Sequence, residues 1–211
     1  MKRAIVVGSG AGGAVVARQL EGSFDVTVLE AGPEFRPLRY ALPRLERLRA
    51  TRLFLDERMI RLLFPMMRVT KADDDMMLIR GVCTGGTTTL ATGNALRCDE
   101  ALRELGLDLD AEFAALQSEL PISTAHERLW GETTRLLFSA CEGLGLEPGV
   151  TPKVVDYSRC RRCGRCVLGC PTGAKWDSRQ MLAQAVESGA RLCTRSRVEK
   201  VIPEPAGSAR S

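Results

Sequence analysis

The sequence Arg-Ala-Ile-Val-Val-Gly-Ser-Gly-Ala-Gly-Gly, at residues 3–13, decides the fold of this 211-residue chain. Residues 3–7 form a short apolar run that is typical of a buried parallel strand, and residues 14–20 after the glycines have helical character. Residues 25–30 (Asp-Val-Thr-Val-Leu-Glu) are typical of a second strand. A strand, a glycine turn, a helix and a strand within about 30 residues predict the first unit of a parallel α/β sheet.

The glycine turn is typical of a dinucleotide-binding loop in a Rossmann-like domain. Gly8 permits the tight turn, Gly10 lets the backbone approach a pyrophosphate, and Gly13 lets the helix and strand pack closely. The N-terminus of the helix that follows the glycines offers free N–H groups and the positive end of its dipole to the phosphates, and Ala11 is expected in the cofactor site. Glu30 ends the second strand and is expected to accept hydrogen bonds from both hydroxyls of an adenosine ribose. A glycine-rich turn without a ligand is the alternative.

The residues after the second strand bear on the choice between a nicotinamide and a flavin cofactor. Glu30-Ala31-Gly32 resembles the flavoprotein version of the motif, in which the fingerprint holds the adenosine half of FAD. We therefore expect FAD as the cofactor, with Ala31 in its site.

A second stretch, residues 80–97, contains glycines, small hydroxyl residues and an amide but almost no bulky side chains. Such a backbone can run flush against a flat or anionic ligand, although a flexible loop would have the same composition. Together with the fingerprint, this stretch resembles the glucose–methanol–choline (GMC) oxidoreductase family, in which a G-x-x-x-G-G-[ST]-[ST] loop ending in Asn lines FAD. The positions that match this loop are Gly85, Gly86, Thr87, Thr88 and Asn94, whereas Val82 and Thr84 depart from it. The absence of a histidine here implies that FAD is bound without a covalent link.

Four cysteines, Cys160, Cys163, Cys166 and Cys170, follow the spacing C-x2-C-x2-C-x3-C and precede a proline. This spacing is that of the bacterial ferredoxin run and predicts a [4Fe–4S] cluster. Structural zinc sites more often use two separated C-x2-C pairs, so zinc is the rival interpretation and unligated thiols are the third. Because the fourth cysteine of such a run can serve another cluster, a remote cysteine is an alternative fourth ligand. The remote cysteines, each more typical of a small buried apolar residue, are Cys83, Cys98, Cys141 and Cys193.

Residues 99–147 have a helical pattern, broken at Pro121 and ending at Gly145. His126 is the only histidine, and its place at the start of the second helix is more typical of a capping or surface residue than of a catalytic base. Asp177 or Ser178 is expected to cap a further helix that ends near Gly189. Strand patterns follow at 190–194 and 198–202.

The residues after the cysteines, Gly-Cys-Pro-Thr-Gly-Ala-Lys at 169–175, are again similar to GMC proteins, a bacterial subset of which carries a cysteine-rich loop here. The resemblance implies an α/β, Rossmann-like FAD-binding domain with a helical insert and a cysteine-rich cluster loop. The predicted divisions are a FAD-binding core at 1–98, a helical segment at 99–150, a cluster loop at 151–176, a return to the FAD domain at 177–203 and a tail at 204–211.

The resemblance also implies that some functional parts lie elsewhere. Family members are longer, and their substrate domain and catalytic His–His or His–Asn pair lie in the C-terminal part, so we expect no catalytic residue in this chain. A complementary subunit carrying the rest of the fold is expected, or the chain is a fragment. In such an enzyme, electrons would pass from the flavin through the cluster to an acceptor protein or quinone. The alternative function for this chain is that of an electron-transfer subunit without substrate chemistry of its own.

Composition excludes several other classes. The net charge of +4 does not indicate a nucleic-acid-binding protein, and no run of 18 apolar residues predicts a transmembrane helix. The apolar run before the first glycine is too short for a signal peptide, so a cytoplasmic protein is expected.

Overall fold

The computed structural model describes residues 1–37, 62, 64–71 and 76–203, and the predicted tail at 204–211 lies outside them. Two compact units divide the chain. The first contains the described residues among 1–35, 51–87 and 178–211, and the second contains those among 36–50 and 88–177. Each unit therefore has its own packing, and they are described in turn.

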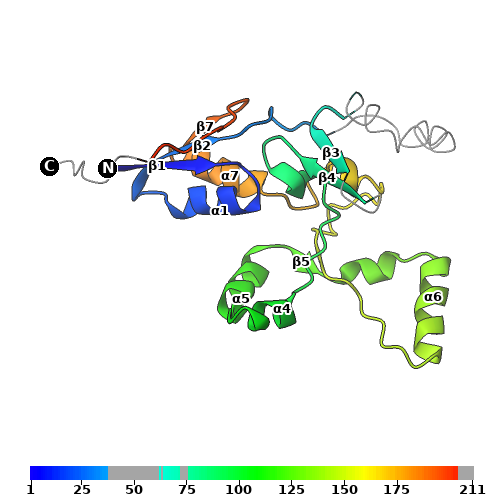
Figure 1. Cartoon of the computed structure of the whole chain (residues 1–211). Coiled ribbons are helices and arrows are strands. Elements are labelled where there is room, and N and C mark those ends of the chain that lie inside the picture. The colour runs from blue at the N-terminus through cyan, green and yellow to red at the C-terminus, as the bar shows by residue number, and fades with distance from the viewer. Residues whose placement is uncertain (38–61, 63, 72–75, 204–211) are drawn as a thin grey trace. The chain divides into compact units, whose positions relative to one another are not determined.

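The first unit is built on a three-stranded parallel sheet (Figure 1). Its strands are β1 (Lys2–Val7), β2 (Phe24–Leu29) and β7 (Arg191–Cys193), with β2 in the middle. Helix α1 (Ala11–Gln19) connects β1 to β2, and helix α7 (Arg179–Glu187) precedes β7. The strand, glycine turn, helix and strand predicted for residues 3–30 are therefore confirmed as a mixed helix and strand fold.

Small side chains let the two helices of this unit approach each other and the sheet. Helix α1 packs against α7, and the Arg18 guanidinium donates a hydrogen bond of 3.3 Å to the Gln184 side-chain oxygen. Ala14, Ala17 and Ala185 are completely buried in this packing, together with Val28 of the central strand. The buried face of α1, formed by Ala14 and Ala17, thus belongs to the core of this unit.

Two strand predictions need correction. The sequence predicts a buried strand at residues 3–7, but β1 is an edge strand among the strands described. Ile5 is 69% exposed, because the described helices cover only the face that carries Val6. Residues 198–202 form no strand; Val201 and Ile202 are 78% and 79% exposed, and no described strand pairs with them. By contrast, β7 lies within the predicted strand at 190–194.

A hairpin in the same unit leads into the glycine–threonine loop. Strands β3 (Met67–Lys71) and β4 (Met77–Gly81) pair antiparallel, with Val69 opposite Ile79. The short 3-10 helix η2 (Gly86–Thr89) follows, and its last two residues belong to the second unit.

The second unit contains helices α4 (Asp99–Glu104), α5 (Asp110–Glu119) and α6 (Glu132–Gly143). Strands β5 (Ile122–Ser123) and β6 (Lys153–Val154) pair antiparallel, and the described residues of this unit also form the 3-10 helices η3 (Ala125–Leu129) and η4 (Cys166–Leu168). The predicted breaks near Pro121 and Gly145 are confirmed. The apolar side chains of α6 are not a packed core, since Leu136 and Leu137 are 65% and 66% exposed.

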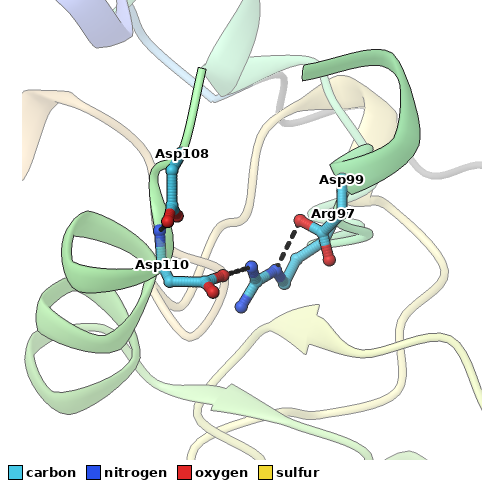
Figure 2. Close-up of polar contacts among 4 residues, drawn as sticks. All are labelled: Arg97, Asp99, Asp108 and Asp110. Carbon is cyan, nitrogen blue, oxygen red and sulfur yellow. Dashed lines mark hydrogen bonds and ion pairs between the residues drawn. The ribbon is translucent and has the colours of Figure 1, made fainter. Parts of the chain in front are cut away.

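One arginine joins the first residues of two helices in this unit (Figure 2). The Arg97 Nε lies 2.9 Å from a carboxylate oxygen of Asp99, which begins α4, and its Nη2 pairs with Asp110, which begins α5. Asp108 accepts a hydrogen bond of 3.0 Å from the Asp110 N–H, and the guanidinium lies over the Phe113 ring. These contacts fix the turn between α4 and α5.

In the described part of the chain, no helix has both the length and the apolar character needed to cross a membrane.

Candidate functional site

The fingerprint glycines have different roles in the structure. Gly8 has a φ of +90°, a conformation that residues with a Cβ rarely adopt, and it turns the chain from β1 toward α1. A Cβ on Gly13 would lie 2.0 Å from the Gly8 carbonyl oxygen, so only glycine fits there. A Cβ on Gly10, which precedes Ala11 at the start of α1, would meet nothing within 4 Å. The fold therefore requires Gly8 and Gly13, whereas Gly10 leaves open space beside the loop.

The glycine–threonine loop approaches the fingerprint backbone to backbone. A Cβ on Gly86 would lie 3.0 Å from the Gly10 Cα, so a side chain at this position would separate the two loops. The Gly85 N–H donates a hydrogen bond of 3.2 Å to the Ser9 hydroxyl oxygen. Gly85, Gly86 and Thr87, all predicted from the second motif, thus belong to the same unit as the fingerprint.

Glu30 is buried and connects β2 to the fingerprint. One carboxylate oxygen accepts hydrogen bonds from the Ser9 N–H at 3.0 Å and from its hydroxyl at 2.6 Å; the other accepts the Gly32 N–H at 2.8 Å. A carboxylate offers about four acceptor positions, and three are used by protein donors. Glu30 therefore orders the loop itself, beyond the ribose contact expected from the sequence, and Ala31 lies half-buried within this turn.

Ser9 and Ser178 are functional candidates that the sequence reasoning missed. Both are fully buried, and the Ser178 hydroxyl lies 3.2 Å from the Ser9 carbonyl oxygen and 3.0 Å from that of Gly85. Ser178 does occupy the N-cap position of α7, but its side chain makes no capping hydrogen bond, which corrects that prediction. Ser9 is an unspecified position of the glycine motif, so its spacing gave no signal.

Two predicted cofactor residues, Thr88 and Asn94, belong to the second unit. The Thr88 carbonyl accepts a hydrogen bond of 2.7 Å from the Lys175 ammonium. The Asn94 side-chain oxygen accepts one of 2.5 Å from the Lys153 ammonium. Each is thus held by a lysine from a later part of the chain.

The four cysteines of the run lie in a segment with repeated turns. Arg162, Gly164 and Gly169 have φ values of +53°, +66° and +89°, so one residue between each two successive cysteines has a left-handed backbone conformation. The described residues nevertheless contain no group of three or more His, Cys, Asp or Glu side chains placed to hold a metal ion. The cysteine thiols therefore do not converge as the ferredoxin-like spacing predicts.

The thiols of the run affect one another's pKa. Burial raises the pKa of the Cys166 thiol, and the negative charge of the Cys170 thiolate raises it further. Cys160 and Cys163 add to this rise, whereas the positive charge of Lys175 opposes it. Burial alone would raise the pKa of Cys170, but hydrogen bonds from the Lys175 N–H and from Thr172 lower it overall. Tyr157 lies beside the same thiols, and burial is the main cause that raises its pKa to about 12.

The remote cysteines differ in burial. Cys83 is completely buried, as expected for a small apolar residue. Cys98 and Cys193 are exposed, so the prediction of burial is wrong for these two, and Cys141 is intermediate.

His126 is neither a capping nor an exposed surface residue, contrary to expectation. It lies within η3 and stacks on the Tyr157 ring at 5.6 Å between centroids. It also lines an open cavity of about 350 Å³ with Trp130 and Phe138. Burial, assisted by the charge of Lys153, lowers its pKa, so it is mostly neutral near pH 7.

Comparison with known proteins found a matching family and several relatives. The GMC oxidoreductase family matches residues 2–210. An uncharacterized GMC-type oxidoreductase of Mycobacterium tuberculosis is 31% identical over 228 residues, which cover 94% of this chain and 32% of the relative. Two long-chain-alcohol oxidases of Arabidopsis thaliana are each 29% identical; the matches cover 94% and 97% of this chain and 26% and 27% of those proteins. The chain thus spans about a third of the first relative's length and about a quarter of the oxidases'.

Proposed function

This chain belongs to the GMC oxidoreductase family, and we propose that it supplies the FAD-binding part of an oxidoreductase that acts on an alcohol. The single observation that carries the cofactor assignment is the open space at Gly10, bounded by a loop that glycines at positions 8 and 13 hold in place. The alcohol is proposed as substrate class because two relatives are long-chain-alcohol oxidases.

The residues proposed to bind FAD fall into two groups. In the first, Gly8, Gly10, Ala11 and Gly13 present the start of α1 to the pyrophosphate, while Glu30 and Ala31 lie beside the adenosine ribose. In the second, the glycine–threonine loop lies along the cofactor through Gly85, Gly86, Thr87, Thr88 and Asn94. When bound, FAD supplies a hydride acceptor for the substrate C–H bond.

A catalytic base is proposed to lie outside these 211 residues. His126 is the only histidine of the chain, and it is packed in an aromatic stack of the second unit. We propose that the part of the GMC fold that these 211 residues do not include supplies the base and most of the substrate pocket.

Substitution of Gly10 tests the cofactor assignment. A Cβ fits at this position without a clash, so Gly10→Ala should fold normally, whereas Gly10→Glu should fill the open space and place a negative charge where the pyrophosphate lies. We expect the purified chain to bind FAD, and Gly10→Glu to abolish this binding while the melting temperature stays within a few degrees of wild type. Flavin absorbance after gel filtration and thermal unfolding measure the two quantities. Unchanged flavin content in Gly10→Glu would refute the assignment.

We further propose that Cys160, Cys163, Cys166 and Cys170 bind a [4Fe–4S] cluster that accepts electrons from the flavin for an acceptor protein or quinone. Their spacing supports this proposal, since four thiols within eleven residues supply the ligand set that such a cluster takes. Because these thiols do not converge in this structure, the segment would have to close as the cluster binds.

Metal analysis separates the cluster from its rivals. Anaerobically purified protein should contain iron and acid-labile sulfide and show a broad visible absorption that dithionite bleaches. Cys163→Ser should lose this absorption, whereas Cys141→Ser, outside the run, should keep it. Stoichiometric zinc without iron would assign the segment to a structural zinc site instead.

A further inference from the structure

Lys175 is a completely buried cation in the second unit, with 1% of its surface exposed. Its ammonium donates hydrogen bonds to three backbone carbonyls, those of Thr88 at 2.7 Å, Thr89 at 3.0 Å and Ala91 at 2.7 Å. An ammonium has three N–H donors, and these three carbonyls can use all of them. The Lys175 ammonium thus donates its hydrogen bonds to one short stretch of backbone, residues 88–91 of the glycine–threonine loop.

The position of these carbonyls explains why a cation is needed. Thr88 and Thr89 are the last residues of η2, and the final carbonyls of a helix have no partner inside it. A positive charge at a helix C-terminus both donates to these carbonyls and opposes their partial negative charge. Without Lys175, three carbonyls would lose a donor; the hydrogen bond to Thr89 is buried and those to Thr88 and Ala91 are partly buried.

The backbone of Lys175 and of the residue after it is held by contacts with residues 154 and 155. Its backbone forms an isolated bridge with Val155, and the neighbouring Trp176 N–H donates to the Val154 carbonyl at 3.0 Å. The Lys175 N–H lies 3.4 Å from the Cys170 sulfur. The methylene stem packs on Gly93, where an added Cβ would come within 3.2 Å of it. Because the Lys175 side chain is held at its backbone end and at its ammonium, the position of its backbone determines where residues 88–91 lie.

We propose that Lys175 is a positioning residue that holds residues 88–91 in the conformation FAD requires. This inference rests on the proposed function, because it assumes that the glycine–threonine loop lines FAD. Lys175 would contact no reacting atom; it would act through the loop carbonyls. Arginine would not replace it, because a planar guanidinium cannot reproduce the three-carbonyl arrangement beside Gly93.

The test compares Lys175→Met with Val155→Ala. Methionine retains most of the apolar stem but removes the donors, whereas Val155→Ala removes buried volume from the segment that pairs with Lys175 and leaves its ammonium intact. We expect Lys175→Met to weaken FAD binding by about tenfold or more, and Val155→Ala to lower the melting temperature with little change in FAD affinity. Titration of apoprotein with FAD and thermal unfolding of the full chain give these values.

Hydrogen exchange separates this inference from the function on which it rests. In Lys175→Met, amides near residues 88–93 should exchange faster by about tenfold or more, while Val155→Ala should leave them near wild type. If wild type binds no FAD, the proposed function fails, yet the exchange data still decide whether Lys175 holds the loop. Equal exchange in the two variants, or equal loss of FAD affinity, would show that Lys175 is only a stability residue and would overturn the proposal.

Discussion

Gly13→Ala should leave the chain unable to bind FAD and should lower its free energy of unfolding by about 3 kcal/mol. The added Cβ would lie 2.0 Å from the Gly8 carbonyl oxygen and 2.9 Å from its carbonyl carbon, and both are backbone atoms that cannot rotate away. Either α1 must move from β1 or the Gly8 turn must change, and each movement distorts the loop proposed to hold the pyrophosphate.

The neighbouring Gly12 provides a matched control. It lies in the same helix and is exposed, and a Cβ added there would meet nothing within 4 Å. Gly12→Ala should therefore keep FAD binding and stabilise the chain slightly, since alanine favours a helix over glycine by about 1 kcal/mol. Urea unfolding and flavin content should be measured for both variants. Similar behaviour of the two would mean that α1 and β1 are not packed as closely as described.

Glu30→Gln should lower the free energy of unfolding by about 2 kcal/mol and weaken FAD binding, although it preserves the size of the side chain. The carboxylate accepts backbone N–H groups at both oxygens, from Ser9 on one side and Gly32 on the other. An amide has only one acceptor oxygen, so its NH₂ group must face one of these N–H donors in either orientation. A buried donor is then left without an acceptor, and the fingerprint loses one of its attachments to β2.

Glu34→Gln is the matched control for this substitution, because Glu34 lies four residues later and is exposed. It should leave the unfolding midpoint within the error of the measurement. Chemical unfolding of both variants, without and with added FAD, would show whether the loss is present in the protein before the ligand binds. A Glu30→Gln variant as stable as Glu34→Gln would contradict the hydrogen-bonding role described for the carboxylate.

The parts of the fold that the sequence predicts are those fixed by short-range chemistry. The glycine turn, α1 and the strands around it follow from residue type and spacing within about 30 positions, and the structure has them where expected. The spacing of the glycine motif also predicts that Gly13 is the position where helix and strand pack too closely for a side chain. It does not reveal that Ser178 reaches Ser9, because that contact joins residues far apart in the chain and a buried serine has no periodic signature.

Errors arose where a local pattern needs a distant partner. Residues 198–202 contain three β-branched side chains, as strands often do, but a strand exists only when another strand pairs with its backbone groups. The helical pattern of residues 99–147 is confirmed in α6, but it does not say what the helix packs on, and Leu136 and Leu137 meet no described core. Likewise, the cysteine spacing specifies which atoms could bind iron, whereas their convergence depends on the fold of the whole segment.

The central strand β2 pairs with β1 from its own neighbourhood and with β7 from near the other end of the described chain, where Val28 lies opposite Leu192. During synthesis on a ribosome, one edge of β2 therefore stays without its partner until residues 191–193 have emerged. The residues from 88 to 177, which form one continuous stretch of the second unit, are all made before then. Throughout that interval β2 presents an open edge, the kind of surface on which nascent chains misassociate, so this sheet is completed only after the continuous stretch of the second unit has been synthesised.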